Sequence, residues 1–114
     1  MEEKTNIEDI VGTYKSILDK KEKNQEYFKN NQKIQKRYEI LYEDLYKAIP
    51  YEIKPVLYQI FDPISEKENT VRWYYTKNAA MGNSPYEMIK EWGIKKGKKL
   101  MEDFILGYKL GISS

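Results

Sequence analysis

The chain contains no cysteine and no histidine. Without thiolates it forms neither disulfides nor zinc fingers, and without imidazole it lacks the usual general base of serine and cysteine hydrolases. Proline is scarce at four residues and glycine at six, and no glycine occurs between Gly12 and Gly82. The missing Cys and His exclude the commonest nucleophilic and metal-dependent sites, and the missing Gly removes the short Gly-containing turn of a helix-turn-helix from this stretch.

Neither sign of charge dominates, since the formal net charge is +2 over 114 residues. So small a charge does not by itself indicate a nucleic-acid partner. No apolar run approaches the length of a membrane span, and the polar start Met1-Glu2-Glu3-Lys4 is unlike a secretory signal. We therefore expect a cytoplasmic protein without a membrane partner.

Aromatic residues are plentiful, with eleven Tyr and three Phe. They supply enough apolar area for one modest core, which argues against disorder. Lysine outnumbers arginine eighteen to two, and Asn, Ile and Tyr are abundant. This composition is typical of an AT-rich bacterial genome or its mobile elements.

Helical periodicity is clearest in the N-terminal part. A capping box at 5–8 precedes six apolar residues on one helical face, which predicts a helix over about 6–21. These residues are Ile7, Ile10, Val11, Tyr14, Ile17 and Leu18. A second helical pattern runs from Tyr27 to Ala48, and two such patterns in sequence indicate a long antiparallel pair. The apolar faces could form a partner groove, but we expect them to face their own core.

Proline and capping residues divide the rest of the chain into shorter helices. Pro50 ends the second helix, and Pro55 fits the first turn of a third. The capping-box pattern at 65–68 predicts a fourth helix over about 66–76. No segment finds a strand partner, so we expect an all-α fold, a compact single-domain bundle of five to six helices.

The densest helix-start signal is Ser84-Pro85-Tyr86-Glu87. Ser caps the first turn, Pro suits the next position, and Glu can reach back to the N–H of the cap. Gly82 and Asn83, just before it, are residue types that readily take a positive φ. Gly93 is a natural end for this helix, and Gly107 inside the last helix indicates the close approach of another helix or a partner.

The sequence shows no recognisable catalytic motif. The acidic pairs Glu43/Asp44 and Glu102/Asp103 are adjacent, and neighbours on a helix point in different directions. The stretch 93–97 lacks the Gly-Lys-Ser/Thr ending of a phosphate-binding loop. We therefore expect a protein that is not an enzyme and that holds no metal and no cofactor.

Lysine clusters raise the alternative of a small nucleic-acid-associated regulator. Residues 15–37 carry eight basic and three acidic side chains, and residues 95–99 hold four lysines in five positions. The candidate phosphate-contacting residues are Lys20, Lys21, Lys23, Lys33, Lys36, Arg37, Lys95, Lys96, Lys98 and Lys99. A solvated helix surface explains the same clusters. The near-absence of Arg and of a compact helix-turn-helix leaves little for base recognition.

The C-terminal half carries a pattern of its own: a tryptophan helix, a Gly- and Pro-containing turn, a short helix, and a final helix ending at Gly. Its residues are Arg72-Trp73, Asn78, Met81-Gly82-Asn83-Ser84-Pro85, Met88-Ile89, Gly93, Leu106-Gly107 and Leu110-Gly111. In this pattern the chain, over about 61–111, resembles the toxin-binding domain of the Xre/MbcA/ParS antitoxin family. It departs from the family in having Met81 for the usual Leu and Asn83 for the usual second Gly.

This resemblance implies a dimeric antitoxin that neutralises a toxin, typically a RES-domain enzyme that consumes NAD, by placing its C-terminal segment at the active-site entrance. It divides the single domain into N-terminal helices (1–60) and a toxin-binding region (61–111). The partner-binding residues would be Trp73, Met81, Gly82, Asn83, Pro85, Lys109, Gly111 and Ser114, of which Trp73, Gly82 and Pro85 would also define the fold.

Two alternatives stay open beside this resemblance. Gly111 could be only a helix stop before a frayed tail. The chain could also be a helical homo-oligomer without a separate ligand. Because no clear helix-turn-helix precedes the domain, direct operator binding has no support in the sequence.

Overall fold

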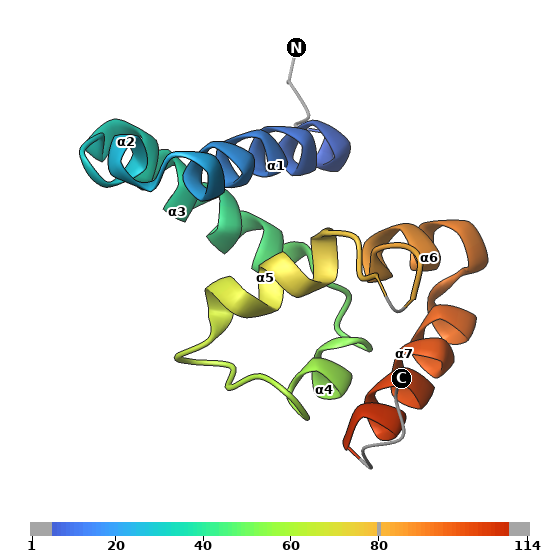
Figure 1. The fold of residues 1–114 in the computed structure, drawn as a ribbon. Coiled ribbons are helices and arrows are strands. Elements are labelled where there is room, and N and C mark those ends of the chain that lie inside the picture. The colour runs from blue at the N-terminus through green and yellow to red at the C-terminus, as the bar shows by residue number, and fades with distance from the viewer. Residues whose placement is uncertain (1–5, 80, 110–114) are drawn as a thin grey trace. The chain divides into compact units, whose positions relative to one another are not determined.

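The computed structural model describes residues 6–79 and 81–109. This part of the chain contains seven helices and no strand, which confirms the all-α class with more helices than the five to six expected. The helices are α1 (Ile7–Lys23), α2 (Gln25–Lys29), α3 (Gln32–Ala48), α4 (Lys54–Leu57), α5 (Lys67–Tyr75), α6 (Pro85–Trp92) and α7 (Ile94–Lys109) (Figure 1). None of them is long and apolar enough to cross a membrane.

The chain divides into two compact units, Met1–Ala48 and Ile49–Ser114. The first unit therefore contains α1, α2 and α3, and the second contains α4 to α7.

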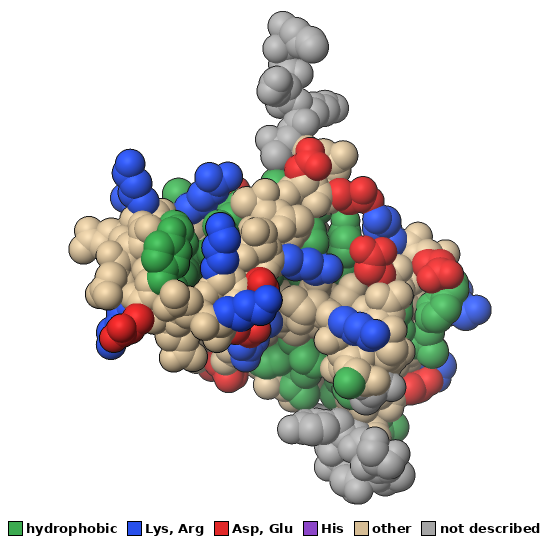
Figure 2. Space-filling view, turned by 45° about the horizontal axis from the view of Figure 1, so that its top comes forward, with side chains coloured by type: hydrophobic (Ala, Val, Ile, Leu, Met, Phe, Trp, Pro, Cys, Tyr) green, Lys and Arg blue, Asp and Glu red, His purple; other side chains and the backbone are tan. Residues whose placement is uncertain are grey.

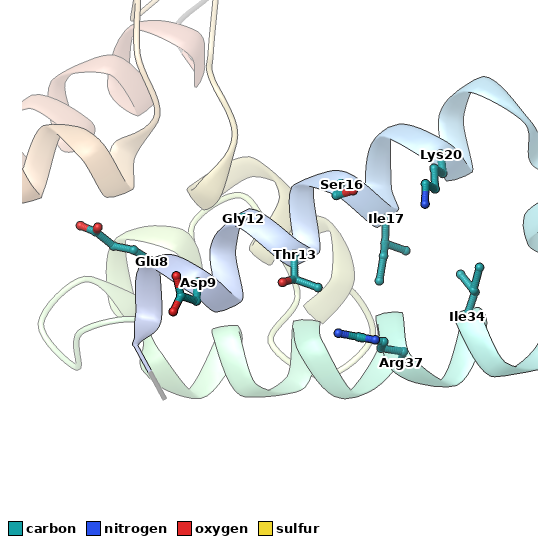
Figure 3. Close-up of a pocket in the computed structure, with 9 residues that line it drawn as sticks. All are labelled: Glu8, Asp9, Gly12, Thr13, Ser16, Ile17, Lys20, Ile34 and Arg37. Atoms are coloured by element: carbon teal, nitrogen blue, oxygen red, sulfur yellow. The ribbon is translucent and has the colours of Figure 1, made fainter. Parts of the chain in front are cut away.

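In the first unit, α1 and α3 form the expected antiparallel pair, as the order of the labelled residues in Figure 3 shows. The predicted inner face of α1 is confirmed, because Val11, Tyr14, Ile17 and Leu18 are buried. The capping residue differs from the prediction. Asn6 is the N-cap, and its Oδ1 accepts a hydrogen bond from the Glu8 N–H at 2.8 Å, whereas Thr5 lies outside the described residues.

The helix expected to run from Tyr27 to Ala48 is interrupted by an asparagine turn. Asn24 caps α2 by accepting from the Tyr27 N–H at 3.0 Å, and Asn31 accepts from the Ile34 N–H at 3.2 Å. Asn side chains compete with the backbone for its hydrogen bonds, which favours ending and restarting a helix here. Gln35 closes the turn by donating to the carbonyls of Phe28 and Lys29 at 2.8 and 2.6 Å.

Tyr38 of α3 is the centre of the first unit. Its ring stacks on Tyr14 of α1 at 5.6 Å and meets Phe28 of α2 edge-on at 5.5 Å. The Lys21 Nζ lies 4.9 Å from the Tyr38 ring centroid and 5.4 Å from that of Phe28. Aromatic and cation–π contacts therefore join all three helices of this unit.

In the second unit, α5 begins without the predicted capping box. Ser65 is not its cap; Glu66 takes the N-cap position and makes no side-chain cap bond. The Asp62 carboxylate instead accepts from the N–H groups of Ile64 and Ser65 at 2.8 and 3.0 Å. These two bonds, that from Ser65 first, hold the pKa of Asp62 below its usual value. An Asp-centred turn thus leads into α5.

The inner face of α5 is made of residues that favour strands by type. Thr70, Val71, Tyr74 and Tyr75 are all buried there. Tyr74 and Tyr75 meet edge-on at 4.8 Å, and Tyr75 lies 5.1 Å from the ring of Tyr86 in α6. The helix expected over this segment is confirmed, because burial against α6 outweighs β propensity.

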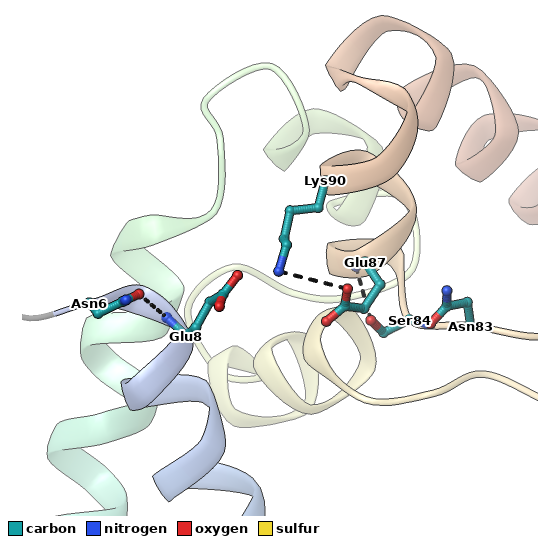
Figure 4. Close-up of polar contacts among 6 residues, drawn as sticks. All are labelled: Asn6, Glu8, Asn83, Ser84, Glu87 and Lys90. Carbon is teal, nitrogen blue, oxygen red and sulfur yellow. Dashed lines mark hydrogen bonds and ion pairs between the residues drawn. The ribbon is translucent and has the colours of Figure 1, made fainter.

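The turn before α6 follows the prediction in its main features. Ser84 caps α6 by accepting from the Glu87 N–H at 3.0 Å, and Pro85 stands in the first turn (Figure 4). Gly82 takes a φ of +78°, whereas no described non-glycine residue, Asn83 included, has a positive φ. The Asn83 side chain accepts from the Ser84 N–H at 2.8 Å. The Ser84 N–H thus bonds to Asn83, whereas the capping box predicted a bond from that N–H to the side chain of Glu87.

Two glycines set the angle between α6 and α7. Gly93, with a φ of +92°, ends α6 and directly precedes α7. A Cβ atom on Gly97 would lie only 2.5 Å from the Cγ1 atom of Ile89, so α7 crosses α6 at its glycine. The close helix approach expected at Gly107 is found at Gly97 instead, since a Cβ on Gly107 would meet nothing within 4 Å.

Candidate partner-binding surfaces

The second unit contains a hollow lined by aromatic side chains, which we call the aromatic hollow. Its volume is about 470 Å³, and it is lined by Gln59, Ile60, Phe61, Trp73, Asn78, Phe104 and Ile105. The half-buried Trp73 ring of α5 lies 6.1 Å from Phe61 and 6.3 Å from Phe104 of α7. The rings come from three segments of the chain, so the hollow exists only in the folded unit.

The chemistry of the aromatic hollow suits recognition of an apolar group. Ile105 is buried at its base, and Gln59 and Asn78 provide its polar atoms. None of the described lining residues is ionisable. Apolar walls with a few amide groups are typical of a site that orients and binds a ligand.

The expected partner-binding residues of the turn lie at different depths. Met81 and Asn83 are half-buried and Gly82 is exposed, whereas Pro85 is buried and can act only through the fold. The turn is connected to the aromatic hollow through Asn78. The Asn78 N–H donates to the Asn83 carbonyl at 3.1 Å, and the Asn78 carbonyl accepts from the Gly82 N–H at 2.8 Å.

The remaining expected partner-binding residues lie at or beyond the end of α7. Lys109 is the last residue of that helix, and its side chain lies outside the described part of the structure. Gly111 and Ser114 lie outside the described residues altogether. Their proposed roles therefore stay predictions.

Four of the candidate nucleic-acid residues lie together in the second unit. Lys95, Lys96, Lys98 and Lys99 line one hollow with Trp92 and Glu102, which we call the lysine hollow. The Lys96 Nζ lies 5.6 Å from the Trp92 ring centroid. Lys99 Nζ also pairs with Asp103 at 3.3 Å. The run of lysines thus lines the same hollow as an indole that is 45% exposed.

The basic residues of the first unit are more dispersed. Lys20 and Arg37 reach a shallow hollow between α1 and α3, which Glu8 and Asp9 also line (Figure 3). Lys23 pairs with Asp19 at 3.3 Å, and Lys21 lies over the rings described above. Lys33 and Lys36 are exposed on α3. Figure 2 shows Lys and Arg side chains together with Asp and Glu side chains on the visible face of the protein.

Burial in the aromatic cluster of α5 and α6 changes the acidity of two tyrosines. Desolvation raises the pKa of Tyr74 and of Tyr75 well above the usual tyrosine value. The neighbouring Tyr86 adds to both shifts, and Tyr74 adds to that of Tyr75. Both hydroxyls stay protonated and belong to the core. Among the described residues, no group of His, Cys, Asp or Glu is arranged to hold a metal ion.

Sequence reasoning selected Trp73 but missed its neighbours Phe61 and Phe104, and it selected four lysines but missed Trp92. The signals were available in part. Phe104 shares the apolar face of the last helix, and Trp92 directly precedes the Gly93 that ends a short helix. Comparisons with protein-family models, with curated proteins and with solved structures each find no match.

Proposed function

We propose that the protein is a non-enzymatic, antitoxin-like binding module that neutralises a partner toxin through α7 and the segment after it. The observation that carries the proposal is the aromatic hollow, in which Trp73 and Phe104 form half-buried walls around an apolar space. Aromatic residues at the centre of an apolar pocket are enriched among the residues that dominate protein–protein binding energy.

The position of the hollow supports this choice of partner surface. It combines the tryptophan helix and the final helix, which are the two elements singled out by the resemblance to antitoxins. Leu106 follows the lining residues on α7 and is 56% exposed. An apolar side chain of the toxin would enter the hollow, while Leu106 extends the contact towards the C-terminal segment.

The resemblance supplies the class of toxin. A RES-domain enzyme that consumes NAD would be inhibited when Lys109, Gly111 and Ser114 stand at the entrance of its active site. The inhibitor then needs no catalytic group of its own, because it acts by occlusion. Affinity would come from the aromatic hollow, and inhibition from the C-terminal segment.

The test is co-expression with a RES-domain toxin from the same genome, with growth and cellular NAD as readouts. We expect the wild-type chain to protect both. Deleting 112–114 or introducing Gly111→Arg should abolish protection while helicity by circular dichroism stays unchanged. Leu106→Lys, at an exposed position on the described part of α7, should weaken the complex at least about tenfold, because it places a charge on the apolar surface next to the aromatic hollow.

The matched control is Trp92→Ala, which also removes an exposed apolar side chain but lies in the lysine hollow. It should protect as well as the wild type. Full protection by all three C-terminal variants would refute the assignment of the binding surface. No protection by the wild-type chain would refute the choice of a RES-type partner.

A further inference from the structure

The lysine hollow brings four lysines, one carboxylate from Glu102 and one exposed indole to the corner between α6 and α7. Lys95, Lys96, Lys98 and Lys99 belong to the start of α7, and Trp92 is the last residue of α6. Gly93 joins the two helices directly, and the contact of Gly97 with Ile89 fixes their crossing. The positions of the lysines relative to the ring are therefore set by the backbone.

We propose that the lysine hollow binds single-stranded nucleic acid, with a base stacked against Trp92 and the adjoining phosphates held by Lys95 and Lys98. This activity is separate from the proposed toxin neutralisation, which uses the aromatic hollow. Proteins that bind single strands without sequence preference combine a positive groove with aromatic rings on which bases stack. Both parts are present here in one hollow.

The lysines follow about one turn of α7. Four residues of an α-helix rise about 6 Å, so Lys95 and Lys99 lie about one turn apart along the helix. Lys96 covers part of the Trp92 ring with its Nζ at 5.6 Å, and it moves to a phosphate when a base takes its place. Lys99 contributes less charge, because Asp103 is 3.3 Å away.

Duplex DNA fits these groups less well. A helix-turn-helix needs a turn of about three or four residues between its helices, whereas Gly93 alone separates α6 from α7. Lysine acts as a point charge and lacks the planar fork with which Arg reads guanine in the major groove. An acidic peptide would satisfy the lysines but would leave the indole unstacked. A single strand uses both features.

The experiment measures binding of oligo(dT) by quenching of Trp92 fluorescence in a Trp73→Phe background, where Trp92 is the remaining tryptophan. We expect quenching at low salt. Trp92→Ala, followed by the anisotropy of a labelled oligo(dT), should weaken binding roughly 5- to 150-fold. Trp92→Phe should lose less, because it keeps a stacking ring. Duplex DNA of the same length and polyglutamate should each bind more weakly than oligo(dT).

The lysines are tested by a matched pair of double variants. Lys95→Gln with Lys98→Gln should make the dependence of log affinity on log salt shallower by about 1.4, since a single strand contributes about 0.7 per phosphate contact. Lys33→Gln with Lys36→Gln removes the same charge at the same spacing from an exposed face of α3 and should leave that slope unchanged. Equal effects of the two double variants would overturn the proposal, as would unchanged affinity in Trp92→Ala or equally tight binding of duplex or polyglutamate.

Discussion

Gly97 of α7 lies directly against Ile89 of α6, where an added Cβ atom would approach Cγ1 of Ile89 to 2.5 Å and its Cα to 3.2 Å. The shorter contact is with a side chain and the longer one with backbone, so the two helices must separate slightly to admit a methyl group. This contact holds the start of α7, which carries the lysines of the lysine hollow, against α6, which ends at Trp92.

We therefore predict that Gly97→Ala destabilises the protein by about 1–2 kcal/mol, since overpacking costs roughly 1–3 kcal/mol and the better helix propensity of Ala recovers up to about 1 kcal/mol. Gly107→Ala in the same helix is the control. Its Cβ meets nothing within 4 Å, so it should be neutral or stabilising by up to about 1 kcal/mol. Urea unfolding of both variants measures the difference, and equal effects would contradict the helix crossing described here.

The two serines that the sequence predicts as helix caps should differ in how much they contribute to stability. Ser84 is buried and caps α6, so Ser84→Ala should cost about 1 kcal/mol of stability. Ser65 is exposed and does not cap α5, so Ser65→Ala should stay within about 0.5 kcal/mol of the wild type. Thermal unfolding followed by circular dichroism compares the two. A larger loss of stability in Ser65→Ala than in Ser84→Ala would contradict the Asp62 turn and would support Ser65 as the cap of α5.

Local signals predicted the helices well where one residue decides the backbone. Gly82, Pro85 and Gly93 each act through their own φ, and the structure has them as expected. Competing signals were harder to rank. At 65–68 the serine pattern predicted a cap on the first turn of the helix, whereas the structure has an Asp62 carboxylate that accepts from the N–H groups of Ile64 and Ser65 just before it.

The surfaces were less predictable than the helices, because they are assembled from separated segments. The aromatic hollow needs Phe61, Trp73 and Phe104 to meet, and no spacing rule connects residues so far apart. The lysines of the lysine hollow could be predicted from the sequence, because residues 95–99 hold four lysines in five positions. Its indole was missed because Trp92 lies across a helix break, where helical periodicity no longer applies.

The buried pair Tyr74 and Tyr75 predicts how stability changes at alkaline pH. Burial favours the protonated hydroxyl, so the pKa of each group is higher in the folded state than the 10.0 of an exposed tyrosine. The unfolded chain then releases protons first as the pH rises. The stabilisation is complete below about pH 10 and is lost as the pH rises from there towards the raised pKa.

Tyr75→Phe tests this directly, because it keeps the ring and removes the ionisable hydroxyl. Above about pH 10 each such tyrosine makes the free energy of unfolding fall by up to about 1.4 kcal/mol per pH unit, and the variant should lose one such contribution. Urea unfolding at several pH values between about 9 and 11 gives the slope. Tyr51→Phe, at a ring that is 84% exposed, should follow the wild-type slope. If Tyr75→Phe kept that slope as well, the hydroxyl of Tyr75 would ionise as readily in the folded chain as in the unfolded one, and its place in the core of α5 and α6 would be wrong.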